Sequence, residues 1–370
     1  ENGVTVGDKI IDDYARFSEV TSRFGTHQYA NPWNDGASGL FYNAALFREH
    51  DIRIPTVVDN AACLKAASNE HGSKSWVDGE AVGLVQVCEY INALRINRDS
   101  NKDNDVAPFV WGGRIVSYWD FLVKNWWVQL IGVDAFNNFY KMESVNSIDP
   151  SLSPMKELKK AVETLDKLVF KAPENSMAYC QSKDHTLAQM DSTNRKAAMM
   201  CNGPWFESEA NAIDAEGFEM MLMPTPFIDG AKQENGKYVA VNNTVAADYA
   251  FIPAAAQNKE LAKKFLAYMC KDEMLQIYTS KAGTVRPFEY VPQTDGLTNC
   301  QKSIIDIWQN SKNFYVVSPT TMSILQHATP FMMEMPYNVL SAGTGYNVEE
   351  FFNKNYQFAK ENWDRWLAEA

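Results

Sequence analysis

Apolar residues recur at helical spacing in several stretches of the chain. The clearest amphipathic helix covers residues 154–170, where Pro154 opens the helix and one face is apolar. The same spacing predicts helices over 9–24, 259–278 and 347–370. Within 259–278 we expect four side chains to be buried, namely Leu261, Phe265, Leu266 and Met269.

Two short apolar runs predict buried strands. They cover residues 197–201 and 218–223, and the second is bounded by Pro224. A further helix is expected to begin at Ser117 and to end at Gly132.

That helix carries three tryptophans. Trp119 and Trp126 are seven residues apart and share a face, which we assign to the core. Trp127 points about 100° away from that face, so we take it as a residue of a cleft. Trp111, beside a pair of glycines at the end of a predicted strand, is a second candidate. Residues 171–194 show little pattern and are expected to form a long loop.

The chain is organised around residues 194–206. A basic turn leads into the buried strand 197–201, which stops at Asn202, Gly203 and Pro204. Gly203 permits backbone angles that other residues avoid, and Pro204 is preset for a first helical turn. Trp205 is therefore expected at the carboxyl end of a strand, where open α/β sheets place ligands. Since large aromatic residues are often simply buried, a core tryptophan remains the alternative.

Four segments, in order, resemble one protein family. The first is Gly39 to Asn43, followed by Leu46-Phe47 and Ile54-Pro55-Thr56. The central stretch, Arg195 to Met200 and then Asn202 to Trp205, is similar to a "GKAAM…NGPW" signature. Phe218 to Pro224 matches a conserved strand of the family, and Asn258 to Leu266, with Gly283, Arg286 and Pro287, matches a helix and its exit. The set resembles the maltose-binding-protein-like, family 1 extracellular solute-binding proteins of ABC sugar importers, over roughly residues 1–290.

The resemblance implies an α/β fold of the type II periplasmic-binding-protein kind, with mixed sheets flanked by helices and a ligand cleft between two lobes. It implies an N-lobe portion from 1–33 and 250–315 and a C-lobe from 36–245 and 316–370. The chain would cross between the lobes near 33–36 and 242–250. The family places a strand, a helix and several more elements before the position of Glu1, so we expect the chain to be a fragment.

The resemblance also implies a sugar site at the crossings. An indole face suits the apolar side of a pyranose, and amide and carboxylate groups suit its hydroxyls. For Asn34 and Asp35, followed by Gly36, an ordinary polar turn is the alternative, and Arg286 is equally consistent with a surface position. The expected ligand-binding residues are Trp33, Asn34, Asp35, Trp111, Trp127, Trp205, Tyr249 and Arg286.

Composition narrows the function further. The 370-residue chain has a net charge of −12, which argues against nucleic acid as a partner, because phosphate binding draws on clustered Lys and Arg. No segment reaches the ~20 consecutive apolar residues of a membrane span. The resemblance implies an extracellular or periplasmic protein, attached to a membrane only through a lipid anchor outside this sequence, with a carbohydrate ligand and an ABC permease as partners, and we expect it to be a monomer.

No cofactor or metal is expected. The six cysteines are scattered, with no Cys-x-x-Cys pair, so buried thiols are favoured, although an exported chain could form a disulfide of unknown pairing. Asp99 to Asp105 places oxygen-bearing side chains at every second position, as calcium loops do. It lacks the loop's glycine and its final glutamate, which favours a solvated acidic loop.

Two other functions stay open on the residues alone. A glycoside hydrolase also uses aromatic residues and carboxylates, and Asp35 with Asp120 could supply the acids, but no hydrolase motif is present. A solute-binding protein for a polyamine, a peptide or another non-sugar solute is the second alternative. The sequence leaves open which sugar is bound and how long it is.

Overall fold

The structure is a computed structural model that describes residue 10 and residues 31–50, 52, 54, 82–96, 106–210, 218–244, 249–316 and 347–369. The predicted helix 9–24 and the segment Asp99–Asp105 therefore lie outside the described residues, except for Ile10, which pairs with Phe288.

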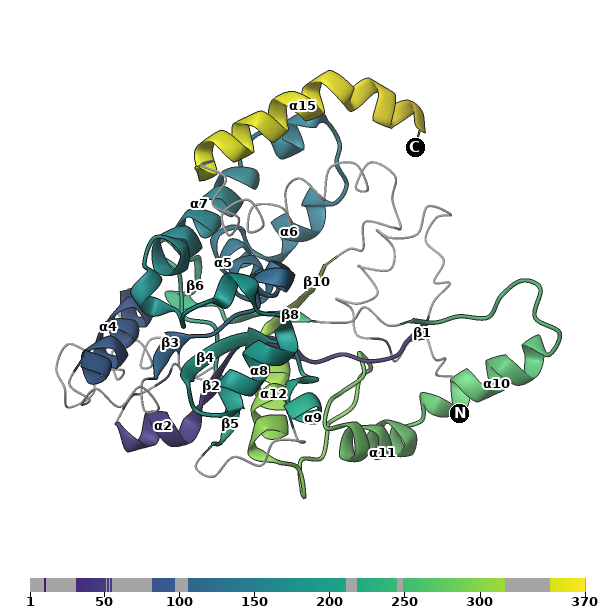
Figure 1. Cartoon of the computed structure of the whole chain (residues 1–370). Helices are drawn as coiled ribbons and strands as arrows, with labels where there is room; N and C mark the ends of the chain where they lie inside the picture. The colour runs from purple at the N-terminus through teal and green to yellow at the C-terminus, as the bar shows by residue number, and fades with distance from the viewer. Residues whose placement is uncertain are drawn as a thin grey trace.

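A six-stranded mixed sheet forms the larger part of the molecule (Figure 1). Its order is β10-β8-β2-β4-β3, and β5 also pairs with β2. β2 is antiparallel to β4, β5 and β8, whereas β8 with β10, and β3 with β4, are parallel. The strands are β2 (Ala37–Asn43), β3 (Ala107–Phe109), β4 (Ala197–Asn202), β5 (Met220–Leu222), β8 (Val241–Thr244) and β10 (Lys312–Tyr315).

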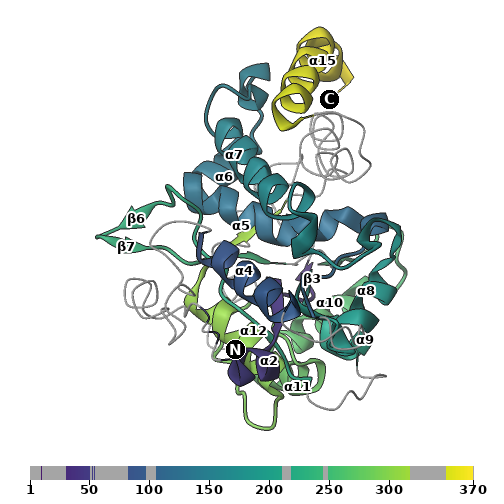
Figure 2. The ribbon, with the colours of Figure 1, turned by 60° about the vertical axis from the view of Figure 1, so that its left-hand side comes forward.

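Helices cover both faces of this sheet (Figures 1 and 2). α5 (Asp120–Ile131) and α7 (Met155–Leu165) lie on one face, and α12 (Asn299–Asn310) lies on the other. α15 (Val348–Glu369) packs outside α7. The remaining helices are α2 (Ala44–Glu49), α4 (Val82–Ile96), η3 (Gly113–Trp119), α6 (Val133–Phe139), η4 (Val145–Ile148), η5 (Asp166–Phe170), η6 (Pro173–Asn175), η7 (Cys180–Ser182), α8 (His185–Thr193) and α9 (Phe206–Ala210).

A smaller part is built around a second, two-stranded sheet. β1 (Asn31–Pro32) pairs antiparallel with β9 (Tyr249–Ala250). α10 (Lys259–Met269), α11 (Asp272–Ala282) and the loop 283–297 complete it, and Figure 1 shows α10 projecting from the rest of the molecule. We call this part the small body, and the six-stranded sheet with its helices the sheet body. Residues 33–36 join β1 to β2 and so connect the two bodies.

The sheet topology corrects one expected boundary. Residues 250–315 were assigned to the first lobe, but β10 pairs with β8 and α12 packs on β2 and β5. The segment 299–315 therefore belongs to the sheet body, because parallel pairing with β8 gives β10 its only backbone partner among the described strands.

The predicted helix 259–278 is two helices, separated at Cys270 and Lys271. Its expected buried face is wrong, since Leu261 is 69% exposed and Phe265 is 55% exposed. The helix 154–170 is confirmed as α7 followed by the π-helix η5, with its apolar stripe buried. The expected loop 171–194 contains α8, whose N-cap Asp184 accepts a hydrogen bond from the Leu187 amide.

Candidate ligand-binding site

Trp205 is held at the end of β4 by the turn that the sequence predicted. β4 is buried throughout, and its last residue, Asn202, pairs with Gly39 of β2. The Asn202 Oδ1 atom then accepts a hydrogen bond from the Gly203 amide at 2.8 Å. The indole of Trp205 folds back over Gly203, where an added Cβ would lie 2.3 Å from the ring. The absent side chain of Gly203 therefore makes room for this ring.

Two further rings contact the half-buried indole of Trp205, and a third contacts one of these two. Phe121 and Tyr118 lie edge-on to it, with ring centroids 5.9 and 6.3 Å away, and His185 lies 6.4 Å beyond Tyr118. All four side chains are half-buried. Burial raises the pKa of Tyr118, while a hydrogen bond with the Trp205 side chain acts in the opposite direction. We call Tyr118, Phe121, His185 and Trp205 the aromatic platform.

The sequence did not identify three members of this platform. Tyr118 and Phe121 are three residues apart at the junction of η3 and α5, a spacing that places two side chains on one helical face. That face differs from the one that carries Trp119 and Trp126. The spacing of Tyr118 and Phe121 was therefore the sequence signal that could have indicated a second aromatic face. His185 could not be found, because the helix α8 that carries it was not predicted.

Trp33 lies in the crossing segment and is half-buried. The guanidinium of Arg286 stands 4.8 Å from the centroid of its indole ring. This arginine is only 1% exposed and is held by the small body. It donates hydrogen bonds to the Met269 carbonyl (2.6 Å), the Pro32 carbonyl (2.8 Å) and the Asn31 Oδ1 atom (3.0 Å). Arg286 therefore supports one face of Trp33 from inside the protein, which corrects the expectation that it faces a ligand.

Asp35 is also buried rather than directed at a cleft. It is 2% exposed, and both carboxylate oxygens accept hydrogen bonds. Burial raises the pKa of this carboxyl from 3.8 to about 7, opposed by the hydrogen bonds from Trp308, Gly36 and Tyr315. The expected contact between Asp35 and a sugar hydroxyl is not supported, because its acceptor atoms are already used by the protein.

The crossing segment touches the turn that carries Trp205. A Cβ added to Gly36 would lie 3.2 Å from Cγ of Pro204 and 2.8 Å from the hydroxyl oxygen of Thr284. The chain between Trp33 and Gly36 can span only ~10 Å, so the two tryptophans lie at one junction. The crossing segment that carries Trp33 therefore meets the turn of the sheet body that carries Trp205.

Two other expected site residues lie in the core of the sheet body. Trp127 is fully buried against Phe136 and Phe139, and its indole N–H donates to the Pro154 carbonyl at 2.7 Å. Its assignment to a cleft is wrong, because α5 is buried on nearly all sides rather than on one face. Trp111 is 6% exposed, and its indole N–H donates to the Ser176 hydroxyl at 3.0 Å.

Asn34 is half-buried beside Trp33. Tyr249 of β9 pairs with Pro32, and the side chain of Tyr249 lies outside the described residues.

The five cysteines of the described part are free thiols, and all are buried. Within the same residues, no cluster of His, Cys, Asp and Glu could hold a metal ion, and no helix is apolar and long enough for a bilayer crossing.

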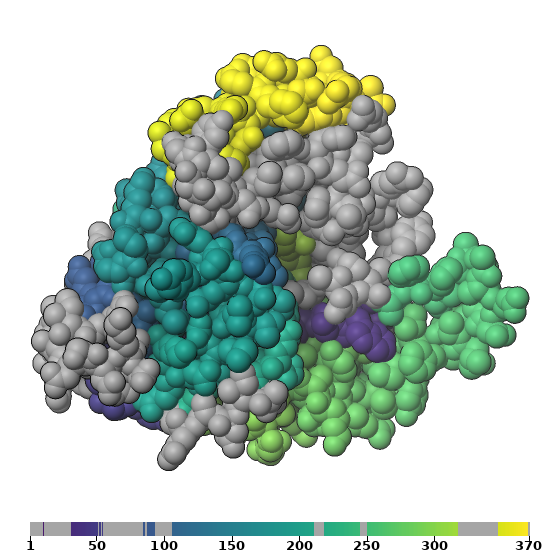
Figure 3. Space-filling view, in the orientation of Figure 1, coloured from purple at the N-terminus to yellow at the C-terminus, as the bar shows by residue number. Residues whose placement is uncertain are grey.

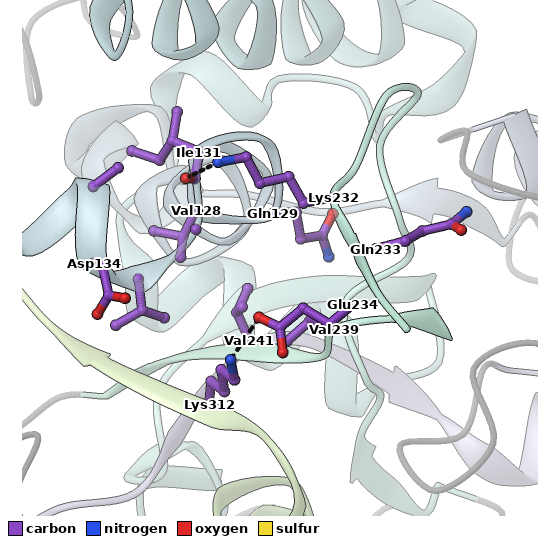
Figure 4. Close-up of a pocket in the computed structure, with 13 residues that line it drawn as sticks. Val128, Gln129, Ile131, Asp134, Lys232, Gln233, Glu234, Val239, Val241 and Lys312 are labelled. Carbon is purple, nitrogen blue, oxygen red and sulfur yellow. Dashed lines mark hydrogen bonds and ion pairs between the residues drawn. The ribbon is translucent and has the colours of Figure 1, made fainter. Parts of the chain in front are cut away.

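A separate hollow of about 510 Å³ lies at the other end of the sheet body (Figure 4). The hollow lies beside Val241 and Lys312, the first residues of β8 and β10. The crossing segment lies at the opposite end of β8, where Thr244 pairs with Ala37. Lys232 donates to the Ile131 carbonyl at 2.5 Å, and Lys312 pairs with Glu234 at 2.6 Å. Both ammonium groups drawn in Figure 4 are thus already bound by the protein.

Comparison with known proteins decides the family. The sequence profile of the bacterial extracellular solute-binding proteins matches residues 2–302. The chain belongs to this family. It is therefore an extracellular solute-binding protein and not an enzyme, which sets aside the hydrolase alternative. Asp120, one of the two acids considered for hydrolysis, is paired with Lys124 at 2.5 Å.

Solved structures share the fold of this solute-binding protein. A chitin oligosaccharide binding protein is 16% identical with a TM-score of 0.63, over 97% of this chain and 77% of its own. Apo RafE from Streptococcus pneumoniae is 15% identical with a TM-score of 0.63, over 95% and 78%. A sugar transporter from Bacillus licheniformis, in complex with stachyose, is 14% identical with a TM-score of 0.56, over 96% and 81%. None of the curated proteins compared with the chain gives a match. The two-lobed periplasmic-binding-protein fold is confirmed.

Proposed function

We propose that this protein is the carbohydrate-binding component of an ABC importer. It takes a neutral mono- or oligosaccharide between Trp33 of the crossing segment and Trp205 of the sheet body. The observation that carries the proposal is that both indoles are half-buried and that the crossing segment with Trp33 meets the turn with Trp205, where Gly36 lies against Pro204.

The chemistry of the platform favours a neutral ligand. None of its four side chains is a carboxylate or an ammonium group, whereas a polyamine site needs several acids. Half-buried aromatic rings, with one face against the protein and the other accessible, suit the apolar faces of sugar rings. The names of two proteins with this fold, the chitin oligosaccharide binding protein and the stachyose complex, support the same ligand class.

Binding would close the protein by a hinge at residues 33–36; residues 245–248 of the second expected crossing lie outside the described residues. A ligand that touches both bodies stabilises the closed form, which a membrane permease would then recognise. The protein would act as a monomer, free in the periplasm or attached to the cell surface by a lipid outside this sequence.

A thermal-shift panel tests the ligand class. Neutral mono- and oligosaccharides, polyamines and short peptides are compared at equal concentration, since a ligand that binds only the folded state raises the unfolding temperature. We expect stabilisation by one or more neutral glycans, with the glycan recovered unchanged. Stabilisation by a polyamine or a peptide alone would contradict the proposal.

A further inference from the structure

Tyr179 is a large aromatic residue that the fold leaves in solvent. It is 83% exposed, the highest value among the large apolar and aromatic residues that the structure describes. Its backbone also lies in the left-handed region, with a φ of +63° and a ψ of +18°. This conformation is unfavourable for a residue with a Cβ atom, and packing of so exposed a ring does not offset the cost.

The loop that carries Tyr179 is fixed on both sides. Before Tyr179, the Met177 amide donates to the Phe109 carbonyl at the end of β3, at 2.9 Å. After it, Cys180 is buried, and the Tyr179 carbonyl accepts hydrogen bonds from the amide (3.1 Å) and the hydroxyl (3.0 Å) of Ser182. A strained residue persists only where its surroundings fix it, and such residues are frequent at ligand sites.

This loop lies at the same edge of the sheet body as the aromatic platform. β3 and β4 are parallel, so both strands end at one edge, where open α/β sheets place ligands. Gly113 of η3 packs on the loop, since an added Cβ would lie 2.3 Å from Cα of Gln181. The same η3 carries Tyr118, and His185 follows the loop as the first residue of α8. The loop therefore borders the platform on the side of Tyr118 and His185.

The separation of Tyr179 from the platform limits the size of a ligand that touches both. The chain from Tyr179 to His185 includes the tight turn η7, so these two Cα atoms lie at most ~20 Å apart. Because the Tyr179 ring is so exposed, it is not packed on the platform itself. A ligand in contact with both must therefore extend beyond the part that stacks on Trp205, as the successive rings of an oligosaccharide do.

We propose that Tyr179 is an outer sugar-binding subsite, which stacks on a later ring of an oligosaccharide whose first ring lies at Trp205. The proposal rests on the proposed function and narrows its ligand class to oligosaccharides. A tyrosine suits this position, because its ring face offers apolar contact to a pyranose while its hydroxyl bonds with water. The left-handed backbone turns this ring outward from a loop whose next residue, Cys180, is buried.

Two variants separate stacking from a structural role. Tyr179→Phe keeps the ring, whereas Tyr179→Gly removes it and relieves the left-handed backbone. Titration calorimetry compares short and long members of three series: chito-oligosaccharides with N-acetylglucosamine, sucrose with raffinose and stachyose, and the best glycan of the thermal-shift panel with its fragments. We expect Tyr179→Gly to weaken the longest members about tenfold and the shortest ones that bind by less than about twofold. Tyr179→Phe should stay within about threefold of the wild type for all members.

Stability supplies a second readout that involves no ligand. With its strained backbone relieved, Tyr179→Gly should unfold at a urea concentration equal to or above that of the wild type. Arg195→Gly is the matched control, because Arg195 has nearly the same φ, +59°, but precedes β4 at the opposite end of that strand. Arg195→Gly should leave the affinity for every glycan unchanged.

The outcomes distinguish the subsite from the proposed function. Wild-type affinity of Tyr179→Gly for the longest members would overturn the subsite and leave the proposed function standing, as would a wild type that binds monosaccharides alone. An equal loss for short and long members, or a lower urea midpoint, would show a structural role for Tyr179 and would also overturn the subsite. If no glycan binds the wild type, the proposed function and the subsite both fail.

Discussion

The indole of Trp205 lies directly over Gly203, two residues before it in the same turn. A methyl group at position 203 would lie 2.3 Å from Cη2, 2.4 Å from Cζ3 and 2.6 Å from Cζ2 of that ring. Two carbon atoms that are not bonded to each other cannot lie this close, so either the ring or the turn would have to move. The orientation of the platform therefore depends on a residue that cannot touch a ligand itself.

Gly203→Ala should displace the Trp205 ring and weaken binding of the best glycan by about tenfold or more, on the scale of a lost aromatic anchor. The unfolding temperature should change little if the ring swings outward. Titration calorimetry and thermal unfolding check the two expectations. Gly236→Ala, in the β6–β7 hairpin (Gln233–Glu234 and Lys237–Tyr238), is the control. Its φ of +75° makes alanine unfavourable, so stability should fall while affinity stays unchanged.

Trp205→Ala should weaken glycan affinity by about 1–3 kcal/mol and leave the fold intact. Trp127→Phe should instead lower the stability of the fold, because it removes the hydrogen bond to Pro154 and leaves a gap in the core. We expect lower stability to urea and normal affinity. The pair separates a ligand-contacting tryptophan from a structural one, and equal affinity of Trp205→Ala and wild type would remove Trp205 from the site.

Much of the sheet body could be predicted from the sequence. β4 and its turn were expected because a buried apolar run ends in Asn-Gly-Pro, and α7 was expected because its apolar stripe is strictly periodic. The helix 259–278 shows the limit of such patterns. Its periodicity is real, yet α10 has no buried residue, since an amphipathic pattern does not say what covers the apolar face.

Arg286→Met should destabilise the protein by about 2–4 kcal/mol. The change removes the donor from the buried Pro32 carbonyl and from two part-buried acceptors of the small body, although it adds no unpaired charge. Urea denaturation measures the loss. Arg286→Lys should recover only part of it, because an ammonium group lacks the planar fork that reaches the Pro32 carbonyl and the Met269 carbonyl together. A substitution with no cost would mean that Arg286 does not support Trp33 as the structure shows.

Asp35 should also make stability fall as pH rises. Its pKa is raised in the folded protein to about 7 from an ordinary value of 3.8, so the folded state holds a proton that the unfolded state has lost between these values. The stabilisation is complete below about pH 4 and disappears as pH rises through about 7, with a size on the order of 4 kcal/mol as an upper bound. Urea denaturation at several pH values checks this. The difference between wild type and Asp35→Asn should follow the same window, and a difference that is constant with pH would contradict it.

The candidate site was only partly predictable, for a physical reason. Trp33 and Trp205 were predicted as site residues because each stands in a turn with a recognisable pattern, and both are half-buried in the structure. Asp35 and Arg286 were also found, but their side chains point into the protein. The sequence of a polar turn cannot tell whether its carboxylate meets solvent or two donors from α12 and β10, which lie more than 270 residues away along the chain.

Titration calorimetry of the best glycan from the panel, with wild type, Trp33→Ala and Trp205→Ala, tests most directly whether one sugar lies between the two bodies. We predict one bound molecule per wild-type chain and a loss of about 1–3 kcal/mol of binding free energy in each variant. Wild-type affinity in both variants, with the fold retained, would contradict the account.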